Sequence, residues 1–200
     1  GKSLAVTASL FATTMTAAGD VYALGDLGTV LRKPMGGTWA KEPVSTSLST
    51  AEFRAVSETS TDEITAVGLG GVIALRTAGA WNPDVLPRDS ADRVNYYGVA
   101  KTSEAVFIAG DSNRVLRRDT DKWRRESTGN LTGPSSNLFA LVASGQDLIV
   151  AGAAGLIERR TAQTKTWSSE DSGTTVMLGA LSNATPLRAV GAQGTMVVQK

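Results

Sequence analysis

One pattern occurs five times in the chain and constrains its fold more than any other feature. Each copy is an apolar segment ending in glycine, two variable residues, usually a second glycine, and another apolar segment. The copies begin at Val21, Ile64, Val106, Leu148 and Leu187. Their first glycines are Gly25, Gly68, Gly110, Gly152 and Gly191, which gives steps of 43, 42, 42 and 39 residues. A period near 42 residues built from short strands is typical of β-propeller blades.

The repeat predicts an all-β chain folded as one β-propeller domain with five four-stranded blades. The fourth copy shows the strand order most clearly, with strands expected at residues 138–143, 148–151 and 156–160 and an outer strand opening at Trp167. The predicted blades cover residues 10–50, 51–94, 95–137, 138–176, and 177–200 together with 1–9. A single domain follows because the repeat runs through the whole chain.

The fifth predicted blade lacks a strand of its own. The last copy reaches Lys200 without a tryptophan or an outer strand, whereas residues 3–8 stand where an outer strand would precede the first blade. Pairing of residues 3–8 with residues 195–199 would close the ring and remove the last exposed sheet edge. The competing hypothesis is that the 200 residues are a fragment of a larger propeller.

The recurring glycines are interpreted as structural. A tight antiparallel connection needs residues at positive φ, which glycine adopts without steric cost. The third copy replaces the second glycine with Asn113, and asparagine is the other residue type that tolerates this conformation. The Gly-x-x-Gly turns are therefore predicted to separate strands rather than to bind phosphate.

Two other residue types recur with the blades. Tryptophan is found at one position in four copies, which predicts packing between neighbouring sheets, with an aromatic platform for sugars or bases as the alternative. Each tryptophan is followed three residues later by an acid, interpreted as charge that protects an outer strand from edge pairing rather than as a catalytic or calcium-binding carboxylate. The pairs are Trp39 and Glu42, Trp81 and Asp84, Trp123 and Glu126, and Trp167 and Glu170.

An arginine recurs near the end of the third predicted strand of four blades. It stands seven residues after the first glycine at Arg32, Arg117 and Arg159, and one place later at Arg76. A solvated position near the rim is favoured. The alternative is a set of guanidinium groups that clamps a carboxylate or phosphate by bidentate hydrogen bonds.

Composition excludes several classes of function. The formal net charge is +1, with 20 basic and 19 acidic residues, so the broad basic surface of a nucleic-acid-binding protein is absent. The chain has no cysteine or histidine, which removes disulfides, thiolate nucleophiles, imidazole bases and the usual zinc ligands. We therefore predict no metal and no other cofactor. No segment approaches the roughly 18 uninterrupted apolar residues of a membrane-spanning helix.

The order of strands and turns resembles that of a known repeat class. The residues that carry the resemblance are Gly25-Asp26-Leu27-Gly28 with Gly36-Gly37-Thr38-Trp39, and Gly152-Ala153-Ala154-Gly155 with Thr164-Lys165-Thr166-Trp167. In these the chain resembles the photosystem II stability/assembly factor-like propellers, which belong to the wider BNR/Asp-box repeats. The resemblance implies a propeller and no particular activity. The chain differs from these relatives, which are typically seven-bladed, because its repeats predict five blades. It also keeps only the last residues of the Asp-box consensus.

The repeat favours a non-enzymatic scaffold that binds a protein or a small polar ligand through its loop face or central channel, because loops can vary on a fixed ring. A multivalent lectin-like module that binds glycans is the alternative. A glycoside hydrolase using two of Asp26, Glu63, Asp111 and Asp147 is a third hypothesis. Candidate binding residues come from the turns and the least repetitive loops: Asp26, Arg93, Tyr96, Tyr97, Asp111, Asn113 and Arg114. We expect a monomer of bacterial origin in the periplasm or outside the cell.

Overall fold

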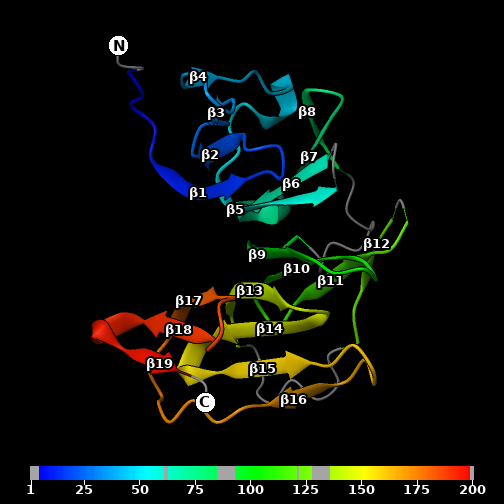
Figure 1. The fold of residues 1–200 in the computed structure, drawn as a ribbon, viewed down its shortest axis with the longest axis vertical. Coiled ribbons are helices and arrows are strands. Elements are labelled where there is room, and N and C mark those ends of the chain that lie inside the picture. The colour runs from blue at the N-terminus through cyan, green and yellow to red at the C-terminus, as the bar shows by residue number, and fades with distance from the viewer. Residues whose placement is uncertain (1–4, 61–62, 85–92, 121, 128–135, 199–200) are drawn as a thin grey trace.

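The protein is described by a computed structural model that covers residues 5–60, 63–84, 93–120, 122–127 and 136–198. It contains five antiparallel sheets in chain order (Figure 1). The first two are formed by β1 (Leu10–Met15), β2 (Val21–Gly25), β3 (Val30–Lys33) and β4 (Ala40–Lys41), and by β5 (Phe53–Ser60), β6 (Glu63–Gly68), β7 (Ile73–Thr77) and β8 (Ala80–Pro83). The next two are formed by β9 (Tyr96–Lys101), β10 (Val106–Gly110), β11 (Val115–Arg118) and β12 (Trp123–Arg125), and by β13 (Leu138–Ser144), β14 (Asp147–Gly152), β15 (Ile157–Arg160) and β16 (Trp167–Ser169). The last contains β17 (Leu178–Ser182), β18 (Arg188–Gly191) and β19 (Met196–Val198).

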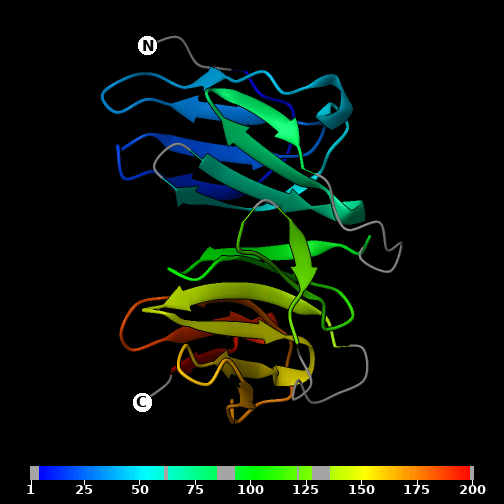
Figure 2. The same cartoon turned by 90° about the vertical axis from the view of Figure 1, so that its right-hand side faces the viewer.

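The five sheets are the blades of a propeller. Their first strands β1, β5, β9, β13 and β17 contact one another in chain order and form an arc around a common centre in Figure 1, while the later strands of each sheet lie outside. Seen from the side in Figure 2, the sheets lie face against face along the long axis of the molecule. The predicted all-β fold with five propeller blades is confirmed.

Four apolar cores lie between consecutive blades. The core between the first two blades includes Tyr22, Leu24, Phe53 and Trp81, and the others join the second to the third, the third to the fourth and the fourth to the fifth. Among the described residues, no such core joins the fifth blade to the first. Each sheet is therefore stabilised mainly by the apolar area that it buries against its neighbours.

The fifth blade differs from the prediction in its strand count. It has three strands, and β19 pairs only with β18 among the described residues. The predicted pairing of residues 3–8 with residues 195–199 is not observed, with residues 1–4 and 199–200 lying outside the described part. Instead, Ser9 donates its N–H to the Asp26 side chain and accepts the Asp26 N–H, each at 3.0 Å. These bonds hold the N-terminal segment against the first blade, where residues 5–8 lie beside Thr29 and Leu31.

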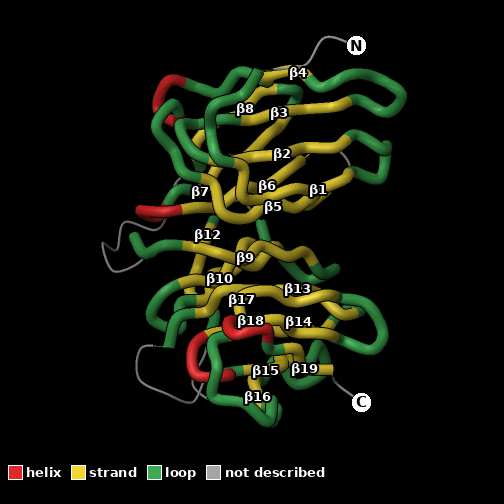
Figure 3. Tube along the Cα trace, turned by 90° about the vertical axis from the view of Figure 1, so that its left-hand side faces the viewer, coloured by secondary structure: helices red, strands yellow, loops and turns green. Residues whose placement is uncertain are grey.

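The repeating turns between second and third strands lie on one face of the propeller, which we call the turn face. Three of them contain short 3₁₀ helices, η2 (Leu69–Gly71), η4 (Ala153–Gly155) and η5 (Ala192–Gly194), while η1 (Thr46–Leu48) precedes the second blade. Figure 3 draws these helical turns in red, toward one side of the molecule. No described helix is long and apolar enough to cross a bilayer.

The two glycines of each turn have different physical roles. The second adopts positive φ as predicted, and Asn113 takes φ 53° in its place. The first is extended, with φ −168° at Gly68 and −164° at Gly152, so backbone angle is not the reason for glycine there. A Cβ at Gly68 would lie 1.9 Å from the Glu52 carbonyl oxygen and one at Gly152 would lie 2.2 Å from that of Asn137. The first glycine is thus required by close approach of two backbones, which corrects the interpretation above.

A polar contact also repeats between the blades. The Trp81 Nε1–H donates to Glu42 of the preceding blade at 2.6 Å, and Arg76 donates two bonds of 2.9 Å to the same carboxylate. We call this arrangement the inter-blade latch. Its later copies are Trp123 and Arg118 on Asp84, and Arg160 on Glu126.

The latch corrects the interpretation of the recurring acids. Glu42, Asp84 and Glu126 bind the next blade instead of protecting an outer edge. The predicted role of the tryptophans between sheets holds for Trp81, Trp123 and Trp167, which are 1–3% exposed, whereas Trp39 of the first blade is 40% exposed.

Candidate functional site

One residue of every inner strand is displaced from the strand pairing by a β-bulge. In the first blade Leu10 lies opposite Gly25 and Ala12 lies opposite Leu24, so that Phe11 is the extra residue. The same irregularity in the other four blades leaves Arg54, Tyr97, Phe139 and Gly179 as the bulged residues. A bulge re-aims its side chain, and such positions recur next to binding sites. We call Phe11, Arg54, Tyr97 and Phe139 the channel-mouth row.

The row points away from the apolar cores. The residue before the bulge is completely buried in the second to fifth blades, as at Phe53 and Leu138, whereas none of the bulged residues belongs to one of the four apolar cores. The inner strands lie around the centre of the propeller in Figure 1, so the row belongs to the strands that border the central channel. The bulges also begin the inner strands, which places the row at the turn face.

The row is formed by two contacts between neighbouring blades. The Arg54 guanidinium lies over the Phe11 ring, 4.1 Å from its centroid. The Tyr97 and Phe139 rings meet with centroids 5.5 Å apart and planes inclined by 58°. Arg54 pairs with Glu52 through Nη2, while its Nε–H is buried without a hydrogen-bond acceptor in the described residues. The mouth therefore offers aromatic faces and a partly satisfied cation.

Three residues from three loops are held together behind Tyr97. The Asn95 side chain donates to Asp111 Oδ2 at 2.8 Å and accepts the Gly70 N–H of the preceding blade at 2.9 Å. Asp111 Oδ1 is buried without a hydrogen-bond partner. Burial raises the pKa of Tyr97, and the negative charge of Asp111 raises it further. Tyr97 is therefore a neutral phenol at physiological pH, able to donate or accept a hydrogen bond.

The structure brings together only part of the predicted binding residues. Tyr97, Asp111, Asn113 and Arg114 belong to one blade at the turn face, whereas Asp26 lies in the corresponding turn two blades away. Arg93 is exposed just before this blade. Tyr96 is completely buried in the core between the second and third blades, so it cannot contact a ligand. Most of the two irregular loops, residues 88–97 and 131–137, lies outside the described residues.

Phe11, Arg54 and Phe139 were not predicted from the sequence. A signal was present, because the bulged residue stands 14 residues before the first glycine in two blades and 13 in the next two. Its residue type differs from blade to blade, so a search for recurring residue types passes over it. A recurring position with varying chemistry is what a scaffold with one asymmetric binding site requires.

The recurring arginines are already engaged within the protein. Arg32 donates to Asp20 at 2.6 and 2.9 Å, Arg117 to Glu104 at 3.0 Å, and Arg159 to Glu170. Arg76 belongs to the latch. The observed partners leave no arginine of this set as an open anion clamp. The side chains are 14–37% exposed and held in ion pairs, instead of the solvated positions that the sequence favoured.

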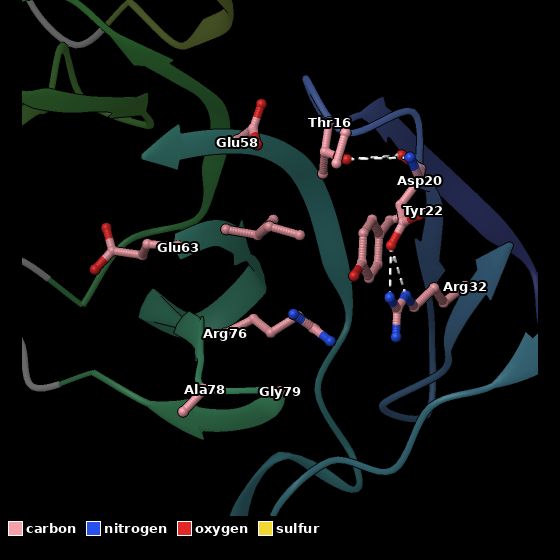
Figure 4. A pocket seen from close by; sticks show the side chains of 11 residues that line it. Thr16, Asp20, Tyr22, Arg32, Glu58, Glu63, Arg76, Ala78 and Gly79 are labelled. Atoms are coloured by element: carbon pink, nitrogen blue, oxygen red, sulfur yellow. Dashed lines mark hydrogen bonds and ion pairs between the residues drawn. The ribbon is translucent and has the colours of Figure 1, made fainter. Parts of the chain in front are cut away.

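A second concave region lies between the first two blades on the face opposite the turns (Figure 4). This inter-blade pocket has a volume of about 440 Å³ and is lined by Asp20, Tyr22, Arg32, Glu58, Glu63 and Arg76, among others. The guanidinium carbons of Arg32 and Arg76 lie 6.0 and 5.3 Å from the centroid of the Tyr22 ring. Such placement stabilises the two cations through the ring faces.

The charged side chains of the inter-blade pocket are engaged by partners within the protein. The hydrogen bond from Arg32, followed by that from the Met35 N–H, lowers the pKa of Asp20, and burial raises the pKa of Tyr22. Glu58 accepts the Ala17 N–H at 2.8 Å, and Glu63 pairs with Thr59 and Arg118. A ligand would have to break these bonds, which favours a structural role for this pocket over a binding role.

The four carboxylates considered for glycoside hydrolysis do not form one site. Asp26 and Asp111 follow second strands and lie at the turn face, whereas Glu63 and Asp147 begin second strands at the opposite face. Three of the four tryptophans considered for stacking on sugars cannot contact a glycan, because Trp81, Trp123 and Trp167 are buried. No group of three or more acidic, histidine or cysteine residues in the described ranges is placed to hold a metal ion.

Solved structures share this arrangement. YCF48 from Cyanidioschyzon merolae superimposes with a TM-score of 0.75 at 15% sequence identity, covering 99% of this chain and 69% of that one. Virginiamycin B lyase from Staphylococcus aureus gives a TM-score of 0.70 at 15% identity, covering 96% and 69%. YCF48 bound to D1 peptide gives 0.71 at 14% identity, covering 97% and 66%.

These similarities show the fold alone. No protein-family model matches the sequence, and neither does any curated protein. The chain spans about two thirds of the length of the three structures above. The combined findings place the chain among the β-propellers.

Proposed function

We propose that the protein is a binding scaffold whose channel-mouth row receives an extended segment of a partner polypeptide. The observation that carries the proposal is the row itself, with two aromatic contacts built from four different inner strands. None of the four side chains belongs to an apolar core, so packing between the blades does not explain them. Rigid aromatic and arginine side chains are the types that dominate binding energy at protein interfaces.

The surroundings of the row suit an extended peptide. Its aromatic faces accept apolar or aromatic side chains, while the partly exposed Arg54 guanidinium can bind a carboxylate or carbonyl oxygen of a peptide. The row spans four consecutive blades, so one segment of several residues can contact all of it. Binding of D1 peptide by YCF48, a protein of the same fold, supports the view that this architecture can bind a peptide.

Selection of linear peptides tests the proposal. Random peptides displayed on phage are selected on the 200-residue chain, and the affinity of a synthesised winner is measured by fluorescence anisotropy. The double variant Tyr97→Ala, Phe139→Ala is expected to bind at least about 10-fold more weakly, since each interface aromatic contributes roughly 1 to 2 kcal/mol.

A matched control separates the mouth from the rest of the surface. Met35→Ala removes a 74% exposed apolar side chain of the β3–β4 hairpin, beside Gly19 of the β1–β2 turn, and is expected to leave the affinity unchanged. Equal binding by the row variant and the parent chain would contradict the proposal, as would failure to select any peptide on the folded chain.

We propose in addition that the repeats are of the BNR/Asp-box type and that the protein acts outside the cytoplasm. The Gly-x-Thr-Trp hairpin residues and the absence of cysteine support these two statements. Fractionation of cells that express the native gene tests the location, and recovery from the cytoplasm alone would contradict it.

A further inference from the structure

One position of the repeating turns combines a strained backbone with an exposed side chain. It directly precedes the second glycine, or the asparagine that replaces this glycine in the third blade, and its φ is positive in every blade. The five residues are Leu27, Gly70, Ser112, Ala154 and Gln193, with φ of 51°, 65°, 57°, 54° and 57°. All five are exposed, so the exposure is a property of the turn position and is not peculiar to one blade.

Leu27 is the residue that suits this position least. Glycine adopts the left-handed conformation readily, whereas a side chain brings its Cβ too close to the following carbonyl oxygen. The later blades have glycine or a small or polar residue here, while the first blade has a branched apolar side chain that is 67% exposed. Such an exposed side chain gains little from packing inside the protein, so stability does not explain the leucine. Backbone strain that brings no structural benefit points to a function.

The turn that carries Leu27 is bonded to the two segments that lead into one contact of the channel-mouth row. The residue before Leu27 donates its N–H to the Ser9 carbonyl at 3.0 Å, two residues before Phe11. The residue after it donates its N–H to the Ala51 carbonyl at 2.8 Å, three residues before Arg54. Leu27 stands between these two bonds, which places it on the turn face beside the first-blade end of the row.

We propose that Leu27 is a further binding residue, which contacts an apolar side chain of the partner polypeptide next to the part that the channel-mouth row holds. The inference rests on the proposed function, because it extends the same site across the turn face. A segment that passes over the contact of Phe11 with Arg54 and continues outward over the first blade meets Leu27 next. Binding removes the exposed apolar side chain from water, which offsets the backbone strain in the complex.

Leu27→Gly separates a binding role from a structural one. Glycine occupies the equivalent position in the second blade, so the variant is expected to fold. With the strain relieved, it is expected to unfold at a higher urea concentration than the parent chain. Its affinity for a peptide selected on the parent chain is expected to fall at least about 5-fold by fluorescence anisotropy, because the apolar contact is lost. Leu27→Met keeps an apolar side chain and is expected to retain most of the affinity.

Gln193→Gly is the matched control. It makes the same backbone change in the fifth blade, whose bulged residue is a glycine and contributes no side chain to the row. This variant is expected to bind the peptide like the parent chain. An equal loss of affinity in Gln193→Gly would attribute the effect to the turns in general and overturn the inference.

An alanine scan of the selected peptide identifies the partner side chain. One apolar residue of the peptide is expected to matter on the parent chain and to have little further effect on Leu27→Gly, since the two changes remove the same contact. Equal effects of every replacement on both chains would overturn the inference, and so would parent-like affinity of Leu27→Gly. Either result, together with weaker binding by Tyr97→Ala, Phe139→Ala, would leave the proposed function standing. A urea midpoint of Leu27→Gly below that of the parent would contradict the strain on which the inference depends.

Discussion

At the scale of single residues, the first glycine of each repeat is selected by a neighbouring carbonyl group. The spacing of these glycines was enough to predict five turns, because the repeat displays them directly. The cause could not be predicted, since the contacting carbonyl belongs to the residue before the inner strand, which has no recurring side chain: Ser9, Glu52, Asn95, Asn137 and Met177.

Alanine at a first glycine should be severely destabilising. A Cβ at Gly152 would overlap the Asn137 oxygen at 2.2 Å, so Gly152→Ala is expected to lower the free energy of unfolding by about 3 kcal/mol. Gly179→Ala is the control, because its Cβ would meet only the end of Met177 at 4.0 Å. Urea denaturation compares the two, and equal midpoints would contradict the close-approach explanation.

The Asp20 carboxylate should make stability depend on pH in the acid range. Arg32 holds the pKa of Asp20 below its ordinary value of 3.8, and the unfolded chain loses this interaction. The unfolded state therefore binds more protons between the two pKa values, and stability falls as the pH drops through that window. Asp20→Asn is expected to flatten the acid side of a plot of melting temperature against pH, and an unchanged slope would argue against this contribution.

At the scale of elements, the latch explains how neighbouring blades are held in register. The sequence showed its three parts, tryptophan, acid and arginine, but each was interpreted within its own blade. The contact joins Glu42 to Arg76 and Trp81, 34 and 39 residues away, and a repeat pattern alone does not reveal pairing between copies. Burial of the tryptophans was predictable because a large aromatic at a fixed position has few other roles.

Removal of one latch carboxylate should weaken the contact between two blades. Glu42→Gln leaves Arg76 half-paired in a mostly buried site and is expected to cost about 2 to 4 kcal/mol of unfolding free energy. Glu170→Gln is the matched control, since Glu170 pairs with Arg159 of its own blade in a more exposed setting and is expected to cost less than about 1 kcal/mol.

Thermal and urea denaturation measure the loss of unfolding free energy in both variants. A Glu170→Gln loss as large as that of Glu42→Gln would mean that the contact between blades adds nothing beyond an ordinary ion pair.

At the scale of the whole molecule, the repeat determines the scaffold. The residues that differ from blade to blade at the bulges form the proposed binding site. The blade count followed from the period alone. The channel-mouth row was found only once the strand register was known, since a bulge is a property of two paired strands.

The most direct test of the binding site is hydrogen–deuterium exchange of the chain with and without a selected peptide. A peptide bound at the channel-mouth row is expected to slow exchange at the start of the inner strands, around residues 9–12, 52–55, 95–98 and 137–140. Slower exchange confined to the borders of the inter-blade pocket, around residues 16–20, 58–60 and 77–79, would place the peptide on the opposite face and contradict it.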